Sequence, residues 1–421
     1  MNSLISYISS FIKRAGSYIF LATLVSRVFS FLASWIALQL LQPKPLGNVL
    51  YAWNFIVFLT PLVGLGLHQS YIRYGALLKS DEEKKQLLNY IIRNGIIGSV
   101  IMTLLVLVFS YLYSFQTTEI NNYLYILSLV FVPIFLFETI KVRARLEHQN
   151  KRFALLEITY NVILIVAVFS LSFYGKTTGY AFSFVLTPLL TCLFFYQQLF
   201  ANTTTNQKPH FVDFEFWKYG FFGGLSNVVT LLLFAIDILL IGAILKDPEQ
   251  VTIYRYLTLI PFSLLFLPRV FITTDFVAFT EKIGNANYIR KYIKGYLLLF
   301  TLISLLICLT FYFSGIFFLA LFDASFTKYN QNFLILTVGI CGILMLRGLY
   351  GNLLSSIGQV KVNFYITSVA IIVNYIANQQ LIPLYGIKGA AITTACLMWM
   401  TGVATLVCFH FLYKKFLLSL K

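Results

Sequence analysis

Arginines inside long apolar runs are the residues of this chain best suited to bind a charged ligand. Arg27 lies near the middle of the apolar run of residues 17–41, and Arg269 and Arg347 lie within two later runs. A guanidinium group keeps its charge and presents paired N–H donors whose geometry matches a phosphate. An arginine at the centre of a membrane helix costs about 2.5–3.5 kcal/mol on insertion scales, so it should face protein, water or a ligand. The three arginines predict a cationic cavity that suits a phosphate or diphosphate.

Polar side chains accompany Arg27 along its predicted helix. They follow one another at steps of four, three and four residues, and they are Thr23, Arg27, Ser30 and Ser34. This spacing places all of them on one helix face, which we expect to line the cavity. When the chain is shifted by 203 residues, Thr230 falls on Arg27, so the second half is polar but uncharged at this depth.

Asp237 and Arg255 are predicted to approach each other at the outer side of the membrane. Asp237 lies near the outer end of the seventh apolar run, and Arg255 lies at the start of the eighth. The short connection between these runs places both side chains at similar depth. They predict an ion pair that closes the outer side, with a static structural pair as the alternative.

Glu138 and Glu157 flank the basic stretch of residues 141–152 near the inner face. We expect the two carboxylates to pair with arginines of that stretch, namely Arg143, Arg145 or Arg152. Because intramembrane carboxylates serve in proton relays, a role of Glu138 and Glu157 in coupling transport to an ion stays open.

Enzyme signatures fail on their details. Gly175, Lys176 and Thr177 match the end of a phosphate-binding loop, but Ser170 stands where the first glycine of that motif belongs. There is no HExxH or GxSxG sequence, the five cysteines lie inside apolar runs without a CxxC pair, and the four histidines are scattered. We therefore predict that the protein is not an enzyme and that it uses no metal and no cofactor.

The composition places these residues in a membrane. Of the 421 residues, 59% are hydrophobic and 11% are charged, whereas soluble domains carry about 25% charged residues. In so apolar a chain, the net charge of +16 indicates cationic loops that face anionic membrane lipids, and no nucleic-acid partner is expected.

Twelve apolar segments are long enough to cross a bilayer. They are residues 17–41, 48–70, 90–115, 122–141, 154–174, 178–200, 217–241, 251–272, 293–322, 329–354, 361–383 and 386–412. With the N-terminus in the cytoplasm, inner loops and ends carry 22 lysines and arginines and outer loops carry 5, as the positive-inside rule requires. The pattern predicts twelve transmembrane helices, both termini in the cytoplasm, and a short amphipathic segment at residues 4–12.

The twelve spans divide into two halves of six. The shift of 203 residues also lays Ser34 on Asp237, so polar positions fall on polar positions. Because six is an even number, the halves have the same orientation and would be related by an axis along the membrane normal. We predict an all-α membrane protein with an N-lobe at residues 1–203 and a C-lobe at residues 204–421 around a central cavity.

Several stretches carry a family resemblance, and they are residues 40–47, 64–66, 237–242, 363–374 and 381–394. The last of them, Leu-Ile-Pro-Leu-Tyr-Gly-Ile-Lys-Gly-Ala-Ala-Ile-Thr-Thr, is the most specific. Together they resemble the polysaccharide flippases called Wzx, of the multidrug, oligosaccharidyl-lipid and polysaccharide (MOP) exporter superfamily. The resemblance covers nearly the whole chain.

This resemblance implies alternating access that moves an undecaprenyl-diphosphate-linked oligosaccharide from the cytoplasmic to the outer leaflet of a bacterial inner membrane. The translocated unit would serve O-antigen (lipopolysaccharide), capsule or exopolysaccharide biosynthesis. The implied partners are anionic membrane lipids, a coupling proton or sodium ion, and other membrane proteins of polysaccharide assembly.

In the related lipid II flippases, arginines of the first, second and eighth helices resemble anchors for the diphosphate. Arg27 and Arg269 match the first and eighth, while the second run has no arginine, so Arg73 beyond its end or Arg347 would substitute. The chain also lacks the two extra C-terminal helices of lipid II flippases, which favours the oligosaccharide-unit type. The full predicted binding set is Arg27, Arg269, Arg347, Arg73, Thr23, Ser30, Ser34 and Thr230.

Two other functions were weighed against flippase activity. A cation-coupled multidrug exporter of the same superfamily would be favoured by an acidic cavity, whereas the deep charge here is positive. A membrane glycan polymerase or ligase needs a large outer loop, and the predicted outer loops are short.

Overall fold

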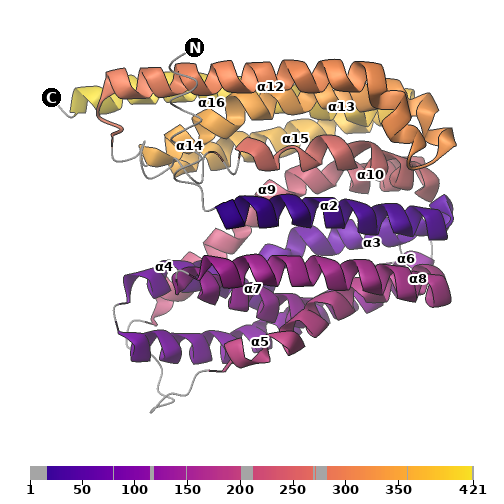
Figure 1. The fold of residues 1–421 in the computed structure, drawn as a ribbon, viewed down its shortest axis with the longest axis horizontal. Coiled ribbons are helices and arrows are strands. Elements are labelled where there is room, and N and C mark those ends of the chain that lie inside the picture. Colours follow the sequence, from indigo (N-terminus) through magenta and orange to yellow (C-terminus); the bar gives the residue numbers. More distant parts are fainter. Residues whose placement is uncertain are drawn as a thin grey trace. The chain divides into compact units, whose positions relative to one another are not determined.

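The computed structural model describes residues 17–78, 80–113, 118–147, 149–200, 212–268, 271, 282–357 and 359–419. Every regular element in these residues is a helix, which confirms the predicted all-α class (Figure 1). The predicted amphipathic segment at residues 4–12 lies outside the described residues.

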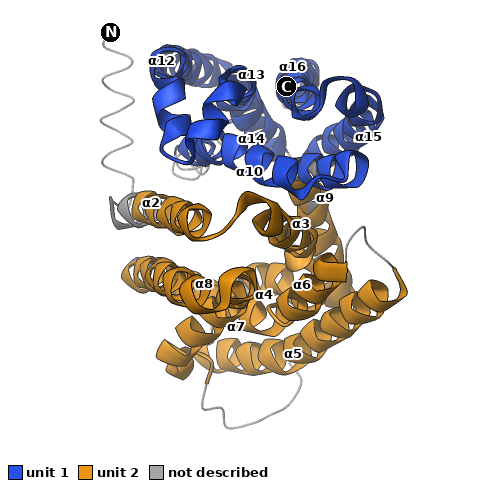
Figure 2. Ribbon diagram, turned by 90° about the vertical axis from the view of Figure 1, so that its right-hand side faces the viewer, with its two compact units in different colours: residues 1–17, 236–421 blue, residues 18–235 orange. Residues whose placement is uncertain are grey.

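Two compact units divide the chain, and Figure 2 shows each in its own colour. Unit 2 comprises residues 18–235, and unit 1 comprises residues 236–421 together with residues 1–17. The division falls inside one helix, α9 (Phe214–Leu245), whereas we predicted a boundary between residues 203 and 204. The assignment of these units to the two lobes of a transporter stays a prediction.

Unit 2 contains the helices that precede α9. They are α2 (Ser17–Leu40), α3 (Pro43–Leu59), η1 (Thr60–Gly66), α4 (Leu67–Leu77), α5 (Asp81–Leu112), α6 (Thr118–Ser128), α7 (Phe131–Leu146), α8 (Asn150–Phe194) and η2 (Tyr196–Gln198).

Unit 1 contains the end of α9 and the helices that follow it. They are α10 (Pro248–Ser263), α12 (Ala286–Ala320), η3 (Ala324–Tyr329), α13 (Asn330–Gly342), the π-helix η4 (Ile343–Arg347), α14 (Gly348–Ser356), α15 (Val360–Tyr385) and α16 (Ile387–Ser419).

Several helices begin at residues whose chemistry favours a helix start. Pro43 and Pro248 occupy the first turns of α3 and α10, where the missing backbone N–H costs nothing. The Asp247 side chain accepts a hydrogen bond from the backbone N–H of Glu249, and Asn285 caps α12 in the same way. Local sequence therefore sets where these helices begin.

The helices have the length and apolarity of membrane spans. Seven of the described helices pass this test, and an eighth follows if α6 and α7, which are bent by 41° relative to each other, count as one span. This supports the predicted class of membrane protein, whereas the count of twelve spans stays a prediction. Residues 154–174, one predicted span, lie within α8, whereas the next predicted span, residues 178–200, begins in α8 and runs past its end at Phe194. The helix α8 is interrupted at Lys176, between the two.

The interruption of α8 has a counterpart in unit 1. Lys176 adopts φ 50° and ψ −134°, and Gly386, between α15 and α16, adopts φ 59° and ψ −141°. Three residues after each, Gly179 and Gly389 pack so tightly that an added Cβ would collide with a backbone carbonyl of the preceding helix. The same tight turn thus occurs in both halves of the chain, as expected of a repeat.

Replacing Lys176 with glycine is expected to stabilise the protein by about 1 kcal/mol, because a side chain at this positive φ is strained and glycine is not. The measurement is thermal unfolding of the purified protein. Gly386→Ala should lower the melting temperature by the same mechanism. Gly175→Ala, next to the turn in open space, is the matched control and should leave it unchanged. A Lys176→Gly protein no more stable than the parent would contradict the strain.

Candidate functional site

Asp237 is the most enclosed charged side chain among the described residues of unit 1, with 1% of its surface exposed. Asn374 and Asn378, on α15, each donate a side-chain N–H to its Oδ1 at 3.0 Å. The Tyr254 hydroxyl, on α10, donates to Oδ2 at 3.1 Å, and the Thr394 hydroxyl, on α16, donates to the same oxygen. Four helices therefore converge on one carboxyl group.

The chemistry of this cluster is that of a small cation site. A buried carboxylate is tolerated only when it is hydrogen-bonded or paired, and all four partners of Asp237 are neutral. Carboxylate, amide and hydroxyl oxygens are the ligands of hard cations, and the Oδ1 of Asn378 is buried without a hydrogen-bond partner in the described residues. The cluster could hold a proton on Asp237 or a metal cation such as sodium. Arg255 is not among these four partners, and its predicted ion pair with Asp237 stays a prediction.

Arg347 lies at the end of the π-helix η4, also in unit 1. Its Nη2 donates to the Thr367 hydroxyl oxygen on α15 at 2.9 Å, and its Nη1 donates to the Thr401 hydroxyl oxygen on α16 at 3.4 Å. The Tyr296 hydroxyl, from α12, donates to the Leu344 carbonyl oxygen inside η4 at 3.0 Å. Short π-helical turns frequently occur at functional sites because they re-aim side chains.

The charge of Arg347 is not neutralised within the described residues. Both of its hydrogen-bond partners are hydroxyl groups, and none of the ion pairs in that part of the chain includes it. Two of the five guanidinium N–H groups are engaged, which leaves donors for an anion. The predicted role of Arg347 in binding a phosphate stays a prediction.

The positions of the other predicted binding residues give no sign of a shared ligand. Arg27 is exposed on α2, and the Ser30 hydroxyl donates to Asn161 Oδ1 on α8 at 2.8 Å, so Ser30 faces α8. Ser34 donates to the Ser30 carbonyl oxygen one turn back at 3.0 Å. Arg73 is exposed on α4, with its guanidinium 4.4 Å from the ring centre of Tyr219.

The side chains of three predicted binding residues are not described by the structure. Arg269 lies outside the described residues, as do the side chains of Thr23 and Thr230. The convergence of all eight residues on one substrate therefore stays a prediction.

Glu138 and Glu157 belong to a separate network in unit 2. Lys141 lies 2.9 Å from Glu138 and 2.7 Å from Glu157, so one lysine bridges both carboxylates. We expected arginines in this role. Glu138 and Lys141 are three residues apart on α7 and so share a face, and α8 brings Glu157 to that face.

The arginines near this network have another partner. Arg143 and Arg152 lie 2.7 Å and 3.4 Å from carboxylate oxygens of Glu147. The two carboxylates proposed for ion coupling are thus both held by Lys141, and their coupling role stays a prediction.

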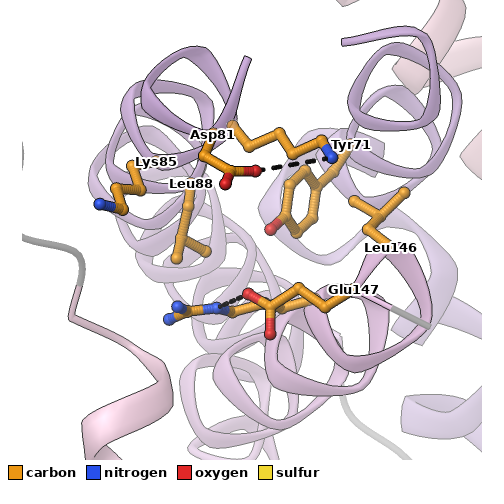
Figure 3. A pocket seen from close by; sticks show the side chains of 8 residues that line it. Tyr71, Asp81, Lys85, Leu88, Leu146 and Glu147 are labelled. Atoms are coloured by element: carbon orange, nitrogen blue, oxygen red, sulfur yellow. Dashed lines mark hydrogen bonds and ion pairs between the residues drawn. The ribbon is translucent and has the colours of Figure 1, made fainter. Parts of the chain in front are cut away.

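A cavity of about 410 Å³ opens between α4, α5 and α7 in unit 2 (Figure 3). Tyr71, Leu88 and Leu146 form its apolar walls, and its charged lining residues are Asp81, Lys84, Lys85, Arg143 and Glu147. Ion pairs join Lys84 to Asp81 at 4.0 Å and Arg143 to Glu147 at 2.7 Å. Because most of its charge is internally paired and no predicted binding residue lines it, we do not assign the substrate to this cavity.

The described residues thus form a helical membrane protein with a buried carboxyl group at Asp237 and an arginine, Arg347, held by two hydroxyl groups. The sequence comparison is more specific. The chain belongs to the polysaccharide biosynthesis protein family, whose model matches residues 12–273. No curated protein sequence matches the chain.

Solved structures of the MOP superfamily share the fold at low sequence identity. The lipid II flippase MurJ in an inward closed conformation has a TM-score of 0.74 and 18% identity over 95% of this chain and 90% of that one. An inward-facing multidrug resistance transporter of the MATE family has a TM-score of 0.70 and 15% identity over 93% and 95%. A MOP transporter from Pyrococcus furiosus, described as having a binding pocket of reversed polarity, has a TM-score of 0.62 and 14% identity over 96% of each chain. These neighbours show the fold, and the match to the polysaccharide biosynthesis protein family supports the resemblance found in the sequence.

Proposed function

We propose that this protein is a flippase that moves an undecaprenyl-diphosphate-linked oligosaccharide from the cytoplasmic to the outer leaflet of a bacterial inner membrane. Membership of the polysaccharide biosynthesis family and the fold shared with a lipid II flippase support this function. The translocated unit would serve O-antigen, capsule or exopolysaccharide assembly, with both termini of the chain in the cytoplasm. The protein would carry out transport and no covalent chemistry.

The observation that carries the proposal is the unneutralised charge of Arg347 within the apolar helices. An anionic ligand stabilises a guanidinium in this setting, because the attraction between the opposite charges compensates for the solvation energy lost on leaving water. A diphosphate supplies such a ligand on each substrate molecule, whereas a cationic drug would be repelled. Arg27, Arg73 and Arg269 are proposed as further phosphate contacts.

Asp237 is proposed as the site of the coupling cation. Glu138 and Glu157 already share the cation of Lys141, whereas the four partners of Asp237 are neutral. A proton or a sodium ion would therefore gain most by binding at Asp237.

The same acidic site favours one alternative, a cation-coupled multidrug exporter, because such a transporter also needs a buried carboxylate. MATE transporters are among the structural neighbours, so the fold admits both functions. The two proposals differ in which phenotype follows from loss of the gene.

Deleting the gene in its host should abolish surface glycan, with the lipid-linked oligosaccharide retained on the cytoplasmic leaflet, because no other path carries a charged diphosphate across the bilayer. The measurement is surface glycan detected by immunoblot or lectin, with protease or glycosidase accessibility reporting the leaflet. Re-expression of the parent chain, or of the exposed-surface control Arg290→Gln, should restore the glycan. Full surface glycan in the deletion strain, combined with raised sensitivity to cationic drugs, would instead support the exporter.

A further inference from the structure

One polar seam between α15 and α16 contacts both Asp237 and Arg347. These helices pack against each other within unit 1 and lie side by side in Figure 2. Asn374 of α15 and Thr394 of α16 both bind Asp237. The side chains that bind Arg347 lie seven residues away on each helix: Thr367 comes before Asn374 on α15, and Thr401 comes after Thr394 on α16.

These contacts follow one antiparallel register. The step from Asn374 to Thr367 on α15 equals the step from Thr394 to Thr401 on α16, in the opposite chain direction. Each charge therefore lies against the same two helices, and seven residues of α-helix separate the two levels by about 10 Å. A buried acid, Asp237, and a half-buried base, Arg347, occupy two levels of one seam, and the hydrogen-bond partners of each are neutral.

We propose that Asp237 and Arg347 act as a coupled pair, in which a cation that neutralises Asp237 strengthens the hold of Arg347 on a phosphate group. The proposal rests on the proposed function, since the phosphate group held by Arg347 would be part of the lipid-linked substrate. While Asp237 is ionised, its negative charge repels an anion placed beside Arg347. Neutralising Asp237 removes this repulsion and leaves the positive field of Arg347 uncompensated.

The size of the effect follows from the spacing. At an effective dielectric constant of about 20, two unit charges about 10 Å apart change a binding constant by about tenfold. By linkage, a phosphate bound at Arg347 raises the affinity of Asp237 for its cation by the same factor. Cation and lipid-linked diphosphate then load together, and loss of the cation weakens the hold on the substrate.

The test is the binding of inorganic pyrophosphate to the full-length protein in nanodiscs of zwitterionic lipid. In sodium-free buffer, Asp237→Asn should bind pyrophosphate about tenfold more tightly than the parent, because the amide mimics a neutralised carboxyl. Asn374→Asp adds a second carboxyl to the same cluster and should bind more weakly than the parent. Arg347→Gln should lose the binding, and Arg290→Gln, an exposed cation on α12, should leave it unchanged.

The cation is identified by exchanging N-methylglucamine for sodium at constant ionic strength. Tighter pyrophosphate binding to the parent in sodium, absent in Asp237→Asn, supports the proposal with sodium as the cation. No sodium effect together with tighter binding by Asp237→Asn supports it with a proton. Equal affinity of the parent, Asp237→Asn and Asn374→Asp overturns it, as does unchanged binding by Arg347→Gln or no binding to the parent. Glycan display in the deletion strain tests flippase function separately, so a chain that displays glycan but fails here is a flippase without this coupling.

Discussion

Replacing Arg347 with alanine is expected to abolish surface glycan without lowering the stability of the protein. The loss of a charge-assisted contact to phosphate costs about 1.5–3 kcal/mol, which weakens binding by about tenfold to a hundredfold. The measurement pairs surface glycan in a complemented deletion strain with the melting temperature of the purified variant.

The stability of Arg347→Ala is expected to be unchanged because of how the hydrogen-bond partners of Arg347 are themselves bonded. Thr367 and Thr401 also donate their own hydroxyl protons to the backbone carbonyls of Asn363 and Met398, at 2.9 Å and 3.2 Å. Removing Arg347 therefore leaves neither hydroxyl without an acceptor, and it removes a charge that is costly to bury.

Arg347→Lys is the informative companion variant. It keeps the charge but loses the planar pair of donors, so partial glycan display is expected. A melting temperature that falls sharply in Arg347→Ala would show that the arginine is structural. Normal glycan display in that variant would remove Arg347 from the substrate site.

Replacing Asp237 with asparagine is expected to reduce glycan display by at least about tenfold while the protein is still produced and folded. The amide is nearly the same size as the carboxyl and can still accept hydrogen bonds from Asn374 and Asn378 through its oxygen. It cannot be charged, so the site would no longer respond to a cation gradient. The decrease follows because a substrate held permanently in the tight state is released slowly.

The measurement combines surface glycan with the response of transport to sodium or proton gradients in membrane vesicles. Asp237→Ala should be less stable than Asp237→Asn, because it removes the acceptor that four buried side chains share, and a buried donor left unsatisfied costs about 1–3 kcal/mol. Transport by Asp237→Asn at the parental rate, with an unchanged gradient response, would exclude Asp237 as the coupling site. The Thr405→Val variant, on α16 but outside both clusters, is the matched control, since its hydroxyl donates to the Gly402 carbonyl oxygen of the same helix.

The charged residues within the apolar runs could be identified from the sequence, because a charge is rare in a segment that crosses a bilayer. Arg347 and Asp237 each interrupt an apolar run, and a charge in such a run is costly enough to require a reason. Their partners were not predictable in the same way. Thr367, Thr401 and Thr394 are ordinary residues of apolar helices, and only the packing of α15 on α16 selects them. Asn374 and Asn378, four residues apart in an apolar run, were a signal available in the sequence and not used.

The internal repeat could also be recognised only in part from the sequence. The turn at Lys176 is the counterpart of the turn at Gly386, but lysine in one half and glycine in the other conceal the match. The backbone angles reveal it because they depend on the path of the chain and not on the side chain. The pairing of Glu138 with Lys141 was missed because several basic residues of that stretch compete for the same carboxylates at similar sequence distance.

The sequence by itself determined that this is a helical membrane protein, that it resembles the polysaccharide flippases, and that charged residues lie inside its apolar runs. Length and apolarity fix the spans, and the cost of burying charge singles out those residues. Only the tertiary structure decided that Asp237 and Arg347 lie against one pair of antiparallel helices. Side chains some twenty to a hundred and forty residues apart become neighbours through helix packing, and no local pattern encodes that register.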